Sequence, residues 1–246
     1  MTNMIYRARK GQYSAGQAIG ILLLDAMLPL APGDVANATS FPFPVIYKTV
    51  ESASSHRLIF ERDPELVQPF IEAGLQLVQQ GARAITSDCG FMALFQDQLA
   101  EALPVPVMLS SLLQVPFIHR MLRKQDKVGI LTAQGQNLTA KHFQSAGIDE
   151  STVVVLGMED TENFYGAFIT ETGVLNTDIA RTEIVGQAKK LVASDPSIKA
   201  VLLECSNMPP YAYAVQEAVG LPVFDFNTMI NHVFSALERR PYQGYE

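Results

Sequence analysis

The sequence predicts an α/β protein made of two pseudo-symmetric α/β domains with parallel sheets, and an active-site cleft between them. Two observations lead to this fold class. Short, nearly continuous apolar runs alternate with amphipathic helical patterns, which is typical of buried parallel strands joined by right-handed helical crossovers. The second observation is an internal duplication, which implies two such sheets rather than one.

The duplication is centred on the only two cysteines of the chain, Cys89 and Cys205. Each copy contains, in order, an amphipathic helix, an apolar strand, a cysteine, a second helix and a Pro-Val strand. The matching pieces have the same spacing from the cysteine in both copies. They are Ala84-Ile85 with Ala200-Val201, and Pro106-Val107 with Pro222-Val223. Each copy therefore places one thiol where a strand ends and a helix begins.

The strands are predicted from apolar runs that are bounded by turn residues. The first run is followed by a long loop, residues 26–44, which is rich in proline, glycine and asparagine. Long loops after strand ends in α/β proteins commonly carry functional sites. The expected strands are residues 19–25, 45–50, 82–87, 105–109, 127–132, 153–156, 200–203 and 221–226.

The helices are predicted from apolar stripes and from their capping residues. Asp63 and Pro64 suit the start of a helix and Gly81 suits its end, while Asn176 is a good N-cap for the longest helix of the second half. Residues 159–173 are ambiguous between a loop and a short helix. The expected helices are residues 65–80, 92–103, 110–121, 138–145, 179–193, 209–219 and 228–237.

Composition excludes several functional classes. The chain has 246 residues, of which 48% are hydrophobic and 17% charged, as in ordinary globular proteins. The formal net charge of −7 offers no basic surface to phosphates, so we expect no nucleic-acid partner. The apolar runs are shorter than a bilayer span, and Asp25 interrupts the one that loosely imitates a signal peptide. We therefore expect a cytoplasmic protein that does not associate with membranes.

The paired cysteines predict a specific chemistry. A thiol at a helix N-terminus is expected to have a lowered pKa, because the helix dipole and exposed N–H groups favour the thiolate. If two such thiols face each other across a cleft, one removes a proton from a carbon next to a carboxylate and the other donates a proton on the opposite face. This inverts the carbon and requires no metal or cofactor. The alternative is a pair of inert buried thiols.

The chain resembles the cofactor-independent Asp/Glu/hydantoin racemase superfamily. The resemblance depends on the two cysteine segments, on the strand at residues 128–132 and on the Pro-Gly-Asp loop at residues 32–34. It implies that the chain ends share one domain, residues 1–108 plus 224–246, which carries Cys89. The second domain, residues 109–223, then carries Cys205. The resemblance also implies a small carboxylate substrate and a homodimer or higher homo-oligomer.

The predicted site contains two catalytic residues, Cys89 and Cys205, and no metal ligands, since the histidines have no metal-ligand spacing. Residues that flank the cysteines are expected to hold a substrate carboxylate through backbone N–H groups, with helix capping as the alternative role. The resemblance adds a threonine at the end of a strand and an acidic residue after the first strand. The predicted substrate-binding residues are Asp25, Ser87, Gly90, Phe91, Thr132, Ser206 and Asn207.

We therefore expect an isomerase, namely a racemase or epimerase of a small amino acid or related acid of the aspartate, glutamate or hydantoin type. Two alternatives remain open. One is a covalent-cysteine isomerase or lyase of a small dicarboxylate, of the maleate isomerase or arylmalonate decarboxylase type. The other is a carboxylate-binding protein without turnover, because Cys89-Gly90-Phe91 and Cys205-Ser206-Asn207 differ from the Cys-Asn-Thr and Cys-Thr-His of glutamate racemases.

Overall fold

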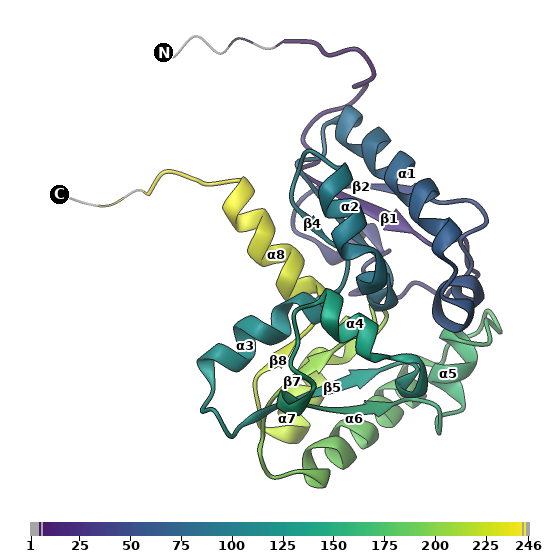
Figure 1. Ribbon diagram of the computed structural model, residues 1–246, viewed down its shortest axis with the longest axis vertical. Helices are drawn as coiled ribbons and strands as arrows, with labels where there is room; N and C mark the ends of the chain where they lie inside the picture. The colour runs from purple at the N-terminus through teal and green to yellow at the C-terminus, as the bar shows by residue number, and fades with distance from the viewer. Residues whose placement is uncertain (1–4, 6, 243, 245–246) are drawn as a thin grey trace.

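The computed structural model describes residues 5, 7–242 and 244, which form two parallel four-stranded sheets stacked one above the other in Figure 1. The strand orders are β2-β1-β3-β4 and β6-β5-β7-β8, so the two sheets have the same topology. The predicted fold class of two pseudo-symmetric parallel-sheet units is confirmed. The strands are β1 (Ile19–Leu23), β2 (Val45–Thr49), β3 (Ala84–Ser87), β4 (Val107–Met108), β5 (Lys127–Thr132), β6 (Val153–Gly157), β7 (Ile198–Leu203) and β8 (Val223–Phe224).

Helices connect the strands in both halves, as the alternating pattern predicts. Several begin with a short 3₁₀ turn, so the regular α-helix starts later than its sequence pattern. The ambiguous segment contains one short helix, α5. The α-helices are α1 (Val67–Gln80), α2 (Gln96–Ala102), α3 (Val115–Met121), α4 (Ala140–Ser145), α5 (Asn163–Phe168), α6 (Thr177–Ser194), α7 (Ala212–Val219) and α8 (Phe226–Leu237).

The caps of the longer helices explain where they begin and end. Asp63 Oδ1 accepts a hydrogen bond from the N–H of Glu65 at 2.9 Å in the turn that leads into α1. Gly81 ends α1 in the left-handed conformation, with φ of 116°, which costs glycine little because it has no Cβ. Asn176 Oδ1 accepts from the first N–H groups of α6. These contacts use backbone groups that a helix terminus leaves unpaired.

The last helix returns the chain to the first sheet. Strand β8 lies at the edge of the second sheet, whereas α8 buries Phe226, Met229 and Ile230 against Ile19 and Ile21 of β1. In Figure 1, α8 (yellow) rises from the junction of the two halves along the upper one. The first strand and the last helix therefore pack together in the half that carries Cys89.

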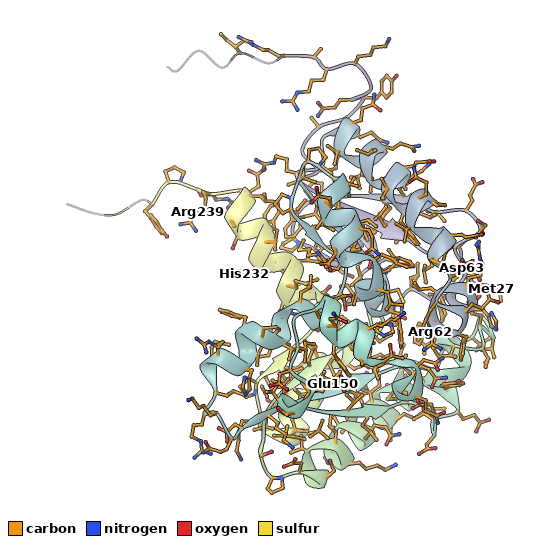
Figure 2. All side chains as sticks on the ribbon, viewed as in Figure 1. Met27, Arg62, Asp63, Glu150, His232 and Arg239 are labelled. Carbon is orange, nitrogen blue, oxygen red and sulfur yellow. The ribbon has the colours of Figure 1, made fainter. Side chains whose placement is uncertain are left out.

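The two halves meet along a continuous apolar core. One cluster of buried side chains combines Phe91 and Leu99 of the first half with Val128 and Phe143 of the second. A further connection lies at the edge where Figure 2 labels Met27: its N–H donates to Glu171 Oε2, which belongs to the loop after α5, at 3.1 Å. Within the described residues, none of the helices has the length and hydrophobicity needed to cross a membrane.

Candidate active site between the two sheets

Cys89 lies where β3 ends and a 3₁₀ helix, η4 (Gly90–Phe95), begins. Its backbone is extended, with φ of −148° and ψ of 123°, as expected of a residue at an N-cap position. Ser87 shapes this turn: its hydroxyl donates to the carbonyl of Leu109 at 2.5 Å and to that of Cys89 at 3.1 Å. The predicted placement of this thiol at a strand–helix junction is confirmed.

Cys205 lies after β7, before the 3₁₀ turn η8 (Pro209–Tyr211) that opens α7. The adjacent Ser206 joins this segment to the first half. Its hydroxyl donates to the backbone carbonyl of Asp88, and its own carbonyl accepts from the N–H of Val35 at 3.3 Å. The two cysteine segments are therefore held directly against each other.

Both thiols line one small pocket between the two sheets. Each cysteine is nearly buried, with Cys89 9% and Cys205 8% exposed, so both reach the pocket but little bulk solvent. Most of the wall is apolar and comes from both halves. Its apolar side chains are Leu24, Leu28, Ile59, Phe91, Ala133, Phe168 and Ile169. Both cysteines therefore border the same pocket.

The ionisable groups around the thiols, other than the thiols themselves, are acidic. Asp88 and Glu204 each precede a cysteine and line the pocket, and the buried Asp34 lies close by. Burial raises the pKa of Asp88 and of Glu204 to about 7, and that of Asp34 to about 6. The described residues that line the pocket include no lysine, arginine or histidine. The site is therefore rich in negative charge as soon as these acids ionise.

The lowered thiol pKa predicted from the helix N-terminus is wrong. Burial raises the pKa of both Cys89 and Cys205 well above the ordinary value, and the negative charge of Glu204 raises both further. A backbone N–H, from Phe91 for Cys89 and from Asn207 for Cys205, lowers the pKa in each case but does not compensate. Burial and the nearby carboxylates therefore raise the thiol pKa by more than the N–H groups of the short 3₁₀ turn lower it. Both sulfurs are therefore protonated thiols in this structure.

Hydrogen bonding makes the two thiols unequal. Cys205 Sγ donates to Asn207 Oδ1 at 3.3 Å, and Asn207 Nδ2 donates to Asp34 Oδ2 at 2.7 Å. Asp34 thereby fixes which end of the amide faces the sulfur, because an ionised carboxylate only accepts. An acceptor at this distance stabilises the S–H form of Cys205. For Cys89, no side-chain acceptor lies within hydrogen-bond distance among the described residues.

Four of the seven predicted substrate-binding residues line the pocket, namely Gly90, Phe91, Ser206 and Asn207. The other three do not. Asp25 is exposed, accepts from the N–H of Ser52 at 3.2 Å and does not line the pocket. Ser87 is buried behind Cys89 in the turn described above. Thr132 is also buried, and its hydroxyl donates to Glu204 Oε2 at 2.7 Å, which makes it a support for a pocket carboxylate.

Sequence reasoning missed the pocket acids Asp88 and Glu204, and gave Asp34 no role. A signal was present, because an acidic residue directly precedes the cysteine in both copies of the duplication. Asp34 gave a weaker signal, as part of the Pro-Gly-Asp loop. Within the part of the chain that the structure describes, no three His, Cys, Asp or Glu residues are arranged to hold a metal ion.

Comparison with known proteins adds relatives in sequence and in fold. The chain is 33% identical to a dimethylsulfoniopropionate lyase of Durusdinium sp. clade D over 85% of its own length and 71% of the relative's. It is also 33% identical to dimethylsulfoniopropionate lyase 7 of Emiliania huxleyi (strain CCMP1516), covering 92% of this chain and 69% of the relative. No family model matches the chain.

Solved structures share the fold at lower identity. Unliganded arylmalonate decarboxylase superposes with a TM-score of 0.57 at 17% identity, covering 93% of this chain and 97% of that one. An aspartate racemase homologue from Pyrococcus horikoshii OT3 gives a TM-score of 0.55 at 20% identity, over 90% and 100%. The fold of the Asp/Glu/hydantoin racemase superfamily, which the resemblance implied, is therefore confirmed.

Proposed function

Because the chain belongs to the dimethylsulfoniopropionate lyase family, we propose that it cleaves dimethylsulfoniopropionate by β-elimination, with the Cys89 thiolate as the base. This substrate carries a carboxylate and, on the carbon β to it, a dimethylsulfonium group. The thiolate removes a proton from the α-carbon, a double bond forms between the two carbons, and the C–S bond breaks. Its electron pair leaves with neutral dimethyl sulfide, and the other product is acrylate. The proton stays on Cys89 and then passes to solvent.

Family membership corrects the predicted activity. The relatives are lyases, so the isomerase class, and with it the racemisation of amino acids, is wrong. The lyase alternative is the better interpretation. The two reactions begin alike, because in both a thiolate removes a proton from the carbon next to a carboxylate. Paired thiols therefore do not distinguish inversion from elimination, and the outcome depends on whether the neighbouring carbon carries a leaving group.

The observation that carries this proposal is the pocket that both thiols share. Elimination needs one base, and the hydrogen bonds favour Cys89 for that role, because Asn207 holds Cys205 in its S–H form. The N–H of Phe91 supports a thiolate at Cys89. Cys205 then remains a neutral thiol on the opposite wall.

The charge of the pocket favours this substrate over a dicarboxylate. A dicarboxylate would bring two negative charges next to Asp88 and Glu204, with no basic side chain among the described lining residues. A sulfonium carboxylate brings one positive and one negative charge. Its methyl groups suit the apolar wall, and a cation is attracted to the faces of aromatic rings such as Phe91 and Phe168. The charges of the pocket therefore disfavour the dicarboxylate substrate that the lyase alternative named.

The proposal is tested by product analysis. Purified protein is incubated separately with dimethylsulfoniopropionate, maleate, phenylmalonate and L-aspartate in D₂O, and the reactions are followed by proton NMR and headspace gas chromatography. We expect dimethyl sulfide and acrylate in equal amounts from the first compound, and no conversion of the others. A folded protein that releases neither product from dimethylsulfoniopropionate would refute the proposal.

A further inference from the structure

Glu204 carries a buried carboxylate oxygen for which the fold provides no partner. The side chain is 0% exposed. Its Oε2 accepts the hydroxyl of Thr132 at 2.7 Å, but Oε1 has no hydrogen-bond partner among the described residues. An unpaired oxygen of this kind is costly to bury, because it has lost water and gained nothing in return. An unpaired buried oxygen of this kind indicates that a bound ligand would be its partner.

The equivalent acid in the other half of the duplication behaves differently. Both oxygens of Asp88 lie within hydrogen-bond distance of the N–H of Leu24, at 3.1 and 3.2 Å. Asp88 is therefore a satisfied group at the end of β3, whereas Glu204 presents one free oxygen at the end of β7. The two acids occupy equivalent positions in the repeat and both are buried, but only Glu204 has an unpaired oxygen.

The chain leaves space for the free oxygen. A Cβ placed on Gly90 would lie 1.9 Å from Glu204 Oε1, so no larger residue fits at this position. Gly90 and Glu204 both line the pocket that contains the thiols. Glu204 is also the charged group with the largest effect on both Cys89 and Cys205, which places its carboxylate beside the reacting centre.

The walls around this oxygen select the kind of cation that it would bind. A metal ion or an ammonium group with N–H bonds needs several polar ligands. Here Leu24, Ile59, Phe91 and Phe168 contribute apolar and aromatic surface to the same pocket that Glu204 lines. An alkylated onium group has a diffuse positive charge and methyl groups, which need apolar and aromatic contact more than hydrogen bonds. The geometry fits an onium cation.

We propose that Glu204 Oε1 is the anionic subsite for the onium group, and that it makes the pocket specific for zwitterionic onium carboxylates with either sulfonium or quaternary ammonium. This inference rests on the proposed function and adds to it the residue that recognises the cation. It also explains how Cys89 becomes a base. Burial and the negative charge of Glu204 favour the protonated thiol, and a bound cation offsets that charge, so the substrate itself favours the thiolate.

The test compares two unreactive ligands of nearly the same shape. In 3-(trimethylammonio)propionate the onium group is a poor leaving group, and in 4,4-dimethylpentanoate a neutral tert-butyl group replaces it. Calorimetry gives the dissociation constant of each for wild type and Glu204→Gln. We expect the substitution to weaken binding of the ammonium compound by about tenfold or more, since it removes a charge next to the cation. Binding of the neutral compound should change by less than about twofold, because the side-chain shape is retained.

Two further variants keep the test decisive. Asp88→Asn removes the other pocket acid, and we expect a smaller change in the ratio of the two dissociation constants than Glu204→Gln produces. If Glu204→Gln does not fold, Thr132→Val provides the test, because it keeps the charge of Glu204 but removes the hydrogen bond that holds the carboxylate. It should partly lower the selectivity for the cation, which is the dissociation constant of the neutral compound divided by that of the ammonium compound. The assignment would be overturned if the ratio of the two dissociation constants were the same in wild type and Glu204→Gln. It would also be overturned if Asp88→Asn changed this ratio as much as Glu204→Gln does. Because binding is measured without turnover, a chain that binds the ammonium ligand through Glu204 but releases no dimethyl sulfide would refute only the proposed function.

Discussion

Asn207 donates a hydrogen bond from Nδ2 to Asp34 Oδ2 at 2.7 Å, although the two residues belong to opposite halves of the chain. Asp34 lies in the long loop after β1, and Asn207 follows the second cysteine. The contact leaves Asn207 Oδ1 facing the Cys205 thiol. One half of the duplicated fold thus orients the amide that accepts a hydrogen bond from the thiol of the other half.

The first prediction concerns this contact. Asp34→Ala leaves the buried Nδ2 of Asn207 without its acceptor, and we expect the free energy of unfolding to fall by about 1–3 kcal/mol. Asp34→Asn keeps an oxygen that Asn207 can donate to, so its loss should be smaller. Urea denaturation of both variants measures the difference. Equal stability of Asp34→Ala and wild type would show that the contact does not hold the two halves together.

A second prediction uses the tight contact at Gly90. Gly90→Ala places a Cβ 1.9 Å from Glu204 Oε1 and 2.6 Å from the Glu204 backbone oxygen. We expect a loss of about 1–3 kcal/mol in the free energy of unfolding, together with loss of elimination activity. The matched control is Gly186→Ala in the middle of α6, where an added Cβ meets no atom within 4 Å. That change should stabilise the protein by about 0.5–1 kcal/mol, because alanine favours helices. If both variants behave alike, the space at Gly90 is not reserved for the carboxylate.

The buried acids predict how stability depends on pH. Burial raises the pKa of Glu204 and of Asp88 to about 7 in the folded protein, whereas carboxyl groups in an unfolded chain titrate at about 4. The folded state therefore binds more protons than the unfolded state between these values, and stability must fall as pH rises from about 4 to about 7. Thermal unfolding at a series of pH values measures this slope. Glu204→Gln should flatten it, and an unchanged slope in that variant would contradict the assignment.

Activity should depend on pH in the opposite direction. Burial and the charge of Glu204 raise the pKa of the Cys89 thiol, so the fraction of thiolate, and with it kcat/KM for dimethylsulfoniopropionate, should increase into the alkaline range. Because a bound cation offsets the carboxylate charge, kcat should reach its plateau at a lower pH than kcat/KM. Steady-state kinetics across the pH range tests both statements. In Cys205→Ser the rising limb should persist, and its disappearance there would indicate that Cys205 is the titrating base.

Much of the fold could be predicted because its signals are local. The eight strands follow apolar runs, and the helices that the sequence predicts follow capping residues such as Asp63 and Asn176. The shared pocket of Cys89 and Cys205 followed from the duplication, since equivalent strand ends of paired sheets face the same cleft.

The chemistry of the site could not be predicted in the same way, because it depends on contacts between distant segments. The thiol pKa of Cys89 is raised by Glu204, which comes from the other sheet, whereas the helix terminus next to Cys89 suggested the opposite direction. Asp25 follows β1 as expected but turns outward toward Ser52. The residues around the cysteines also do not distinguish a lyase from a racemase, because the two reactions share their first step.

The central claim, that Cys89 is the base of an elimination, is tested most directly by the rate of dimethyl sulfide release from dimethylsulfoniopropionate in wild type, Cys89→Ser and Cys205→Ser. A serine hydroxyl is a far weaker acid than a thiol, so the account predicts that Cys89→Ser loses at least about 10³-fold in kcat/KM, since the general base is lost. Cys205→Ser, whose hydroxyl can still donate to Asn207, should keep far more activity. Dimethyl sulfide release by folded Cys89→Ser at the wild-type rate would contradict the account.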